Sequence, residues 1–145
     1  MLLTSRVVLL LLSSLLVSAT LAQPPEASLA PWLRQQRWQK RVVLLCAPGG
    51  TTPELTTQRQ LLGAATSELQ ERDVVVREVL FDHLSADDRY YLTQELQVKT
   101  SGFTLLLIGK DGGVKRRETA PIRPAVLFGT IDTMPMRRQE ARRPR

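Results

Sequence analysis

The chain has one cysteine, Cys46, and one histidine, His83, and these are its most obvious candidates for chemistry. Cys46 ends an apolar run, and residues 46–54 read CAPGGTTPE. A reactive thiol needs a lowered pKa, usually from a helix N-terminus or a neighbouring cation. Cys46 lies several residues before the next expected helix, so we expect an inert packing residue. The alternative is an atypical single-cysteine oxidoreductase or peroxidase that uses Cys46 with an external reductant.

The hydroxyls of Thr51 and Thr52 need a base before they can act as nucleophiles, and nothing places His83 beside them. A threonine directly before Pro53 is more typical of a helix cap. The N-terminus of that helix remains an alternative weak anion site. One histidine and one cysteine provide no metal-ligand cluster. Residues 109–113 lack the Lys-Ser/Thr ending of a phosphate-binding loop. We therefore predict no catalytic residue, no metal and no cofactor.

Positive charge is concentrated in the last quarter of the chain, where residues 110–145 contain ten Lys or Arg and four Asp or Glu. An acidic partner, a membrane surface or a polyanion suits such a region. The basic region has no interleaved aromatic residues, so we do not expect sequence-specific nucleic-acid binding. The candidate binding residues are Lys115, Arg116, Arg117, Asp132, Met134, Met136, Arg137 and Arg138.

Two interpretations of residues 132–140 stay open. In the first, Asp132 caps a restarted helical turn, Met134 and Met136 cover the end of the sheet, and the arginines are solvated. In the second, a methionine-lined patch beside Arg137 and Arg138 recognises a carboxylate or an acidic partner.

The first 22 residues resemble a secretory signal, with Arg6 before an apolar run and small residues before Gln23. The apolar segment is shorter than the roughly 20 residues that span a bilayer. We therefore expect cleavage near Ala22, a secreted or periplasmic protein, and no transmembrane segment in the mature chain. The expected organisation is a signal peptide over 1–22, a linker and first turn over 23–37, one domain over 38–140, and a basic tail over 141–145. We expect one helical turn over Trp32 to Trp38, with both Trp residues covering the edge of the core.

Hydrophobic periodicity predicts the element order β-α-β-α-β-β-α. A helix long enough to act as a crossover makes the first two strands parallel, and the Asp111-Gly112 turn makes the last two antiparallel. A mixed four-stranded sheet flanked by helices follows, in the α/β class. The expected strands are Arg41 to Ala47, Val74 to Leu80, Phe103 to Ile108 and Val114 to Glu118. The first expected helix begins at Pro53 and continues through Leu69, the second follows a Ser85 cap, and the last begins at Pro124.

This succession of elements resembles the thioredoxin-like fold from Arg41 to about Ile131. In that fold the loop after the first strand normally carries a Cys-x-x-Cys pair, where this chain has residues 51–54, TTPE. The fold also has a cis-proline beside the active site, at a position that corresponds here to Thr104. The resemblance therefore implies the shape of a redox protein without two of its functional features.

Two longer strings, GKDGGVK at 109–115 and IDTMPMRRQE at 131–140, resemble a family of secreted, peroxiredoxin-like domains of unknown function. Similar domains occur in exported bacterial proteins and in sushi-repeat extracellular matrix proteins. The resemblance implies a thioredoxin-like fold and export, and no established activity. Our sequence-based hypothesis is an exported, non-catalytic binding or scaffold module. Its partner is an unknown exported protein or an acidic partner.

Overall fold

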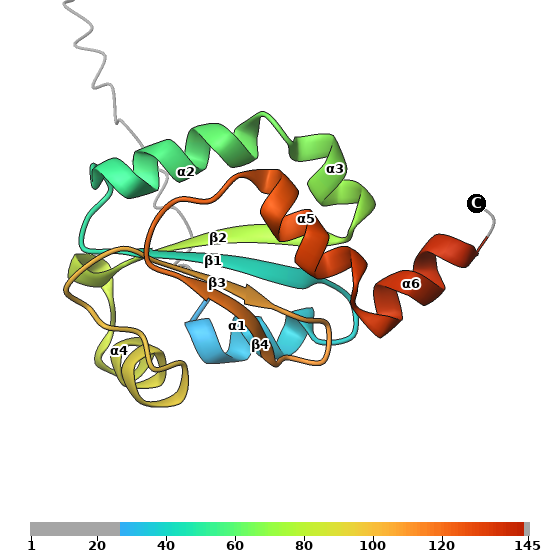
Figure 1. The fold of residues 1–145 in the computed structure, drawn as a ribbon. Coiled ribbons are helices and arrows are strands. Elements are labelled where there is room, and N and C mark those ends of the chain that lie inside the picture. Colours follow the sequence, from blue (N-terminus) through green and yellow to red (C-terminus); the bar gives the residue numbers. More distant parts are fainter. Residues whose placement is uncertain (1–26, 144–145) are drawn as a thin grey trace, which may run out of the picture.

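The computed structural model describes residues 27–143, and its centre is one four-stranded sheet with the strand order β2-β1-β3-β4 (Figure 1). The central strand β1 pairs in parallel with β2 and antiparallel with β3, and β3 pairs antiparallel with β4. The strands are β1 (Arg41–Ala47), β2 (Val74–Leu80), β3 (Thr104–Ile108) and β4 (Val114–Glu118). The predicted mixed sheet is confirmed, and only β3 starts one residue later than expected.

Helices cover both faces of this sheet (Figure 1). On one face lie α2 (Pro53–Gly63), α3 (Thr66–Glu71) and α5 (Pro124–Asp132). On the other lie α1 (Leu29–Gln36) and α4 (Ala86–Tyr90), with a short 3-10 turn (Phe81–His83) and a π-helical turn (Tyr91–Glu95). A last helix, α6 (Pro135–Arg142), lies beyond the end of the sheet. Every helix within residues 27–143 is too short or too polar to cross a membrane.

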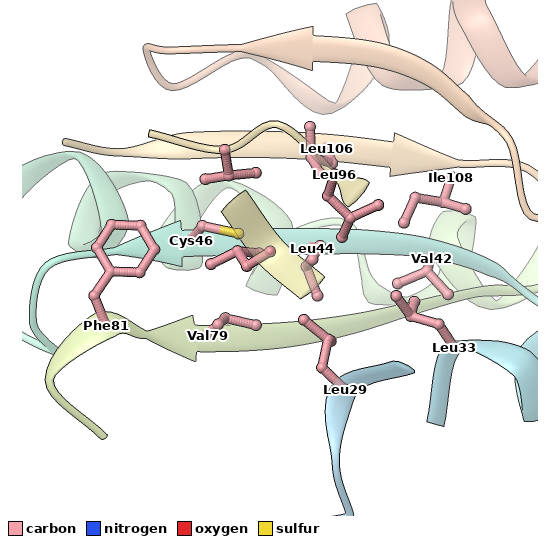
Figure 2. Close-up of a cluster of buried hydrophobic side chains, with 12 residues drawn as sticks. Leu29, Leu33, Val42, Leu44, Cys46, Val79, Phe81, Leu96, Leu106 and Ile108 are labelled. Carbon is pink, nitrogen blue, oxygen red and sulfur yellow. The ribbon is translucent and has the colours of Figure 1, made fainter. Parts of the chain in front are cut away.

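Strand β1 is buried along its whole length, as its continuous apolar run predicted. Because successive side chains point to opposite faces, β1 supplies both halves of the core. Val43 and Leu45 pack towards α2 and α5, while Val42, Leu44 and Cys46 pack towards α1 (Figure 2). Full burial of each such aliphatic side chain contributes roughly 1.5–3 kcal/mol, so the two faces together fix the sheet between its helices.

The helical turn predicted over Trp32 to Trp38 belongs to a longer helix, α1, which begins inside the segment predicted as a linker. Helix α1 begins at Leu29, whose side chain is only 1% exposed, and the N–H of Leu29 donates to Asp88 Oδ1 at 2.8 Å. Leu29 and Leu33 recur one turn apart and both enter the core, so burial overrides the Pro- and Ala-rich composition. The signal segment 1–22 lies outside the described residues.

Trp38 does not cover the core edge as expected, since it is 66% exposed with a φ of +66°. The predicted basic tail is shorter than expected, because α6 continues to Arg142. The predicted helix through Leu69 is divided into α2 and α3 at residues 64–65.

At the β3–β4 hairpin the predicted turn is confirmed. Gly112 adopts a φ of +84°, which favours glycine.

Candidate functional site

The sheet has two ends at which a functional site could lie. The loop between β1 and α2, which follows Cys46, lies at one end, and the β3–β4 hairpin with the α5–α6 junction lies at the other (Figure 1). Since β3 runs antiparallel to β1, Arg41 at the start of β1 and Gly109 after the end of β3 share the hairpin end. The six residue steps of β1 separate the two ends by about 20 Å.

Cys46 is fully buried, opposite Thr104 in the β1–β3 pair and beside Val79 and Phe81 in the core (Figure 2). Burial raises the pKa of the Cys46 thiol to about 12, against a smaller lowering influence from Arg117. At neutral pH the sulfur is therefore a protonated thiol without access to solvent. Its place in the core agrees with the predicted packing role.

The β1–α2 loop is closed by its own contacts. Thr52 occupies the N-cap position of α2, but its side chain does not accept a helix N–H. Instead, Thr52 Oγ1 donates to the Gly49 carbonyl at 2.7 Å, so the predicted capping bond is wrong. Arg59 donates to the Gly50 carbonyl at 2.8 Å and pairs with Glu78 at 2.6 Å. This loop is therefore tied to β2, while the exposed His83 lies in the 3-10 turn after that strand.

The hairpin end contains a cavity of about 340 Å³. Its walls come from the start of β1, the β3–β4 hairpin and the α5–α6 junction. The side chains that line it include the bases Arg41, Lys110 and Lys115 and the apolar Met134 and Met136. Three of the eight residues predicted for binding thus meet at one concave surface. Arg41 and Lys110 were missed as site residues, although Arg41 begins a buried strand and Lys110 belongs to the string GKDGGVK.

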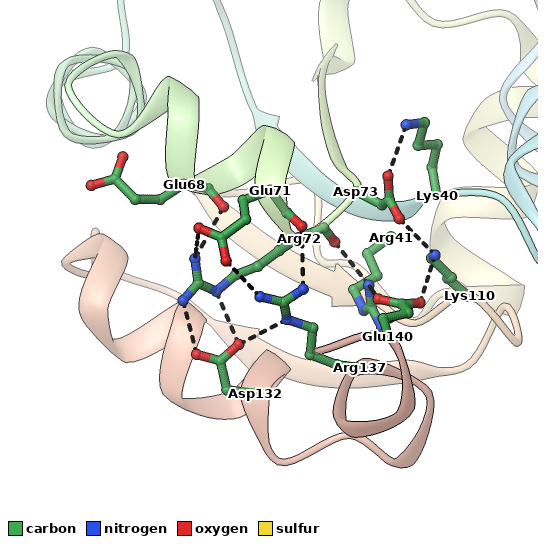
Figure 3. Close-up of polar contacts among 10 residues, drawn as sticks. All are labelled: Lys40, Arg41, Glu68, Glu71, Arg72, Asp73, Lys110, Asp132, Arg137 and Glu140. Carbon is green, nitrogen blue, oxygen red and sulfur yellow. Dashed lines mark hydrogen bonds and ion pairs between the residues drawn. The ribbon is translucent and has the colours of Figure 1, made fainter. Parts of the chain in front are cut away.

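Behind this cavity, Glu140 of α6 holds two buried bases (Figure 3). Glu140 Oε2 lies 3.1 Å from Arg41 Nη1, and Glu140 Oε1 lies 2.7 Å from Lys110 Nζ. Lys110 also pairs with Asp73 at 2.9 Å. Burial raises the pKa of Glu140, but hydrogen bonds from Lys110 and Arg41 outweigh it and the net pKa is lowered. Glu140 is therefore ionised at neutral pH and fastens α6 to the sheet.

A second ion-pair cluster lies between α3, α5 and α6 (Figure 3). Arg137 is 8% exposed and pairs with Glu71 at 2.9 Å and with Asp132 at 3.3 Å. Arg72 also binds Asp132, at 2.9 Å, and its hydrogen bond is the main reason that the pKa of Asp132 is lowered. The first interpretation of this segment is therefore wrong for two residues, because Asp132 does not cap α6 and Arg137 is not solvated.

Met134, rather than Asp132, occupies the N-cap position of α6, and it also packs against the core. In the second interpretation, Arg137 and Arg138 recognise an acidic partner. This is wrong for Arg137, because Glu71 and Asp132 of the same chain already bind its guanidinium. Arg138, its neighbour on α6, is exposed.

The basic residues of β4 also contact their own chain. Lys115 pairs with Asp111 at 2.7 Å, and Arg117 donates to the Leu96 carbonyl at 2.7 Å. Arg116 donates to Thr130 Oγ1 at 3.0 Å. Of these three residues only Lys115 lines the cavity. The structure thus divides the predicted binding set into cavity residues, a structural pair formed by Asp132 and Arg137, and peripheral bases.

Comparison with solved structures identifies the fold. The reduced 2-Cys peroxiredoxin of Plasmodium vivax is similar with a TM-score of 0.57 and 16% identity, over 74% of this chain and 84% of that protein. A cysteine-to-serine mutant of peroxiredoxin 6 from Arenicola marina gives a TM-score of 0.51 and 17% identity, over 70% of this chain and 64% of that protein. At such identities the likeness shows a thioredoxin-like, peroxiredoxin-like fold alone.

A family model supplies the remaining assignment. The model described as Domain of unknown function (DUF4174) matches residues 32–140. This range contains all four strands, the cavity at the hairpin end and both ion-pair clusters. Because the match spans well over half of the sequence, the chain belongs to the DUF4174 family.

Proposed function

We propose that this protein is an exported, non-catalytic binding domain whose ligand site is the cavity at the hairpin end. The observation that carries the proposal is the state of Cys46. The chain's only thiol is 0% exposed, and burial raises its pKa to about 12. A thiolate that attacks peroxide requires the opposite environment, with solvent access and a lowered pKa.

A cysteine-dependent peroxidase is the competing function, since the similar structures are those of peroxiredoxins. The test is hydrogen peroxide consumption by the wild-type protein and by Cys46→Ala, each with a thiol reductant in excess. We expect the two proteins to consume peroxide at the same background rate, with circular dichroism confirming that both are folded. Turnover by the wild type that disappears in Cys46→Ala would establish the peroxidase instead.

Export is supported by the sequence of residues 1–22. The protein recovered from the exported fraction of its own cells should begin at Gln23, which amino-terminal sequencing checks. A chain that keeps residues 1–22 and stays with the cells would contradict export.

An acidic ligand, free or carried by another exported protein, is the partner that we propose for the hairpin end. Three bases line the cavity there, and the exposed Arg138 lies on the adjoining helix. Attraction between an exposed base and an acid is screened by salt. Binding should therefore weaken as ionic strength rises, and salt-independent binding would count against an acidic ligand.

A further inference from the structure

We infer that the cavity at the hairpin end binds a small molecule with one carboxylate and an apolar body. This inference rests on the proposed binding function and specifies its ligand. The cavity volume of about 340 Å³ lies within the roughly 300–1,000 Å³ that is typical of small-molecule sites. Such sites are mostly apolar, with a few polar groups that fix the ligand's orientation, and the same mixture lines this cavity.

The net charge around the cavity favours a ligand that carries one negative charge. Three bases and Asp111 line it, and Lys40, outside the cavity, shares Asp73 with Lys110. The acids that pair with these four bases are Asp73, Asp111 and Glu140. Four bases against three acids leave one positive charge, which one carboxylate neutralises. A second negative charge would face these acids without a base of its own.

Donors that could hold the carboxylate are already in place. Arg41 contributes positive charge rather than a contact, because its Nε is buried and its Nη1 and Nη2 already bind Glu140. Lys110 Nζ carries three N–H donors and uses two of them, on Asp73 and Glu140. Lys115 Nζ uses one, on Asp111. Lys110 and Lys115 together thus keep three unused N–H donors for a ligand carboxylate at the cavity.

The part of the wall at the start of α6 suits an apolar body. Met134, Pro135 and Met136 line the cavity at the start of α6 and present no charge to it. Methionine side chains are flexible and polarisable, so they adapt to aliphatic or aromatic groups of different shape. Burial of such a group supplies affinity in proportion to the apolar area covered. The ligand class is therefore a medium-chain or aromatic monocarboxylate, rather than a phosphate or an inorganic anion.

Titration of the isotopically labelled protein with hexanoate, hexanamide and acetate, followed by NMR, tests this inference. Hexanoate should bind saturably and shift the amide signals of residues 109–115 and 134–136. Hexanamide keeps the apolar body but lacks the charge, and acetate keeps the charge but lacks the body. We expect each to bind at least about tenfold more weakly, which corresponds to the loss of one modest interaction. Equal binding of hexanoate and hexanamide would overturn the inference.

Matched variants locate the site. Lys115→Gln and Met136→Gln should each weaken hexanoate binding by about tenfold, since both side chains line the cavity and neither belongs to the core. Arg142→Gln removes a base from the exposed end of α6 and should leave the affinity unchanged. An equal loss in Arg142→Gln would indicate surface attraction and overturn the cavity assignment. Absence of saturable hexanoate binding would also overturn it, whereas only cysteine-dependent peroxide turnover would contradict the non-catalytic function.

Discussion

Iodoacetamide should modify Cys46 in the native protein at least about a thousandfold more slowly than in the urea-unfolded chain. The reason is the thiolate population, because alkylation requires the deprotonated sulfur. Burial raises the pKa of Cys46 from 9.0 to about 12, and three pKa units reduce the thiolate fraction at neutral pH by about a thousandfold. The fully buried position beside Phe81 adds steric exclusion. Mass spectrometry of samples quenched at intervals measures both rates.

A thiol placed at an exposed position of the same protein provides the control. Ser101→Cys in the Cys46→Ala background puts the sulfur in the exposed turn before β3, where we expect reaction at the rate of the unfolded chain. If native Cys46 reacts as fast as this control, then the loop after β1 opens readily. The peroxidase hypothesis would then regain its physical basis.

The sheet was predictable from the sequence because its signals are local. The continuous apolar run of β1 and the Asp111-Gly112 turn each specify an element without reference to distant residues. The start of helix α1 was predicted three residues late, at Trp32, because Leu29 lies in a Pro- and Ala-rich segment. That helix depends on burial against the sheet and on the bond from Leu29 to Asp88, 59 residues away.

The candidate site was predictable only in part, for the same reason. Met134, Met136 and Lys115 belong to recognisable strings, and the fold does bring them to one cavity. The roles of Arg41 and Glu140 depend on contacts between residues 99 positions apart, and no local pattern specifies such a pair. Arg137 was predicted to be exposed, because a base in a polar helix is normally solvated. In the structure it is buried and pairs with Glu71 of α3 and Asp132 of α5.

Glu140→Gln should lower the free energy of unfolding by about 3 kcal/mol, which is the usual cost of removing one partner from a buried ion pair. The glutamine side chain is nearly the same size, so the change removes charge rather than volume. Arg41 and Lys110 are 1% and 8% exposed; Arg41 would lose the carboxylate that pairs with it, and Lys110 would keep Asp73 alone. Urea denaturation followed by circular dichroism measures the difference. Glu95→Gln, at an exposed position, should change stability by less than about 0.5 kcal/mol.

A double-mutant cycle shows whether the effect acts through the buried bases. In the Lys110→Met background, Glu140→Gln removes a carboxylate partner from Arg41 alone instead of from both Arg41 and Lys110, so its cost should be clearly smaller than in the wild type. Equal costs in the two backgrounds would mean that Glu140 stabilises α6 by some other contact.

Acidification should remove the difference between the wild type and Glu140→Gln. The pKa of Glu140 is lowered in the folded protein, so the unfolded chain takes up this proton first as the pH falls. Its stabilisation is therefore complete above the unfolded-state pKa of about 4.3 and is lost as the pH falls below that value. Since the amide that replaces this carboxyl group in the variant cannot titrate, the two unfolding curves should converge in acid. A constant gap from pH 7 to pH 3 would show that the charge of Glu140 does not hold α6 on the sheet, and the cavity would then lack the fixed wall that its proposed ligand requires.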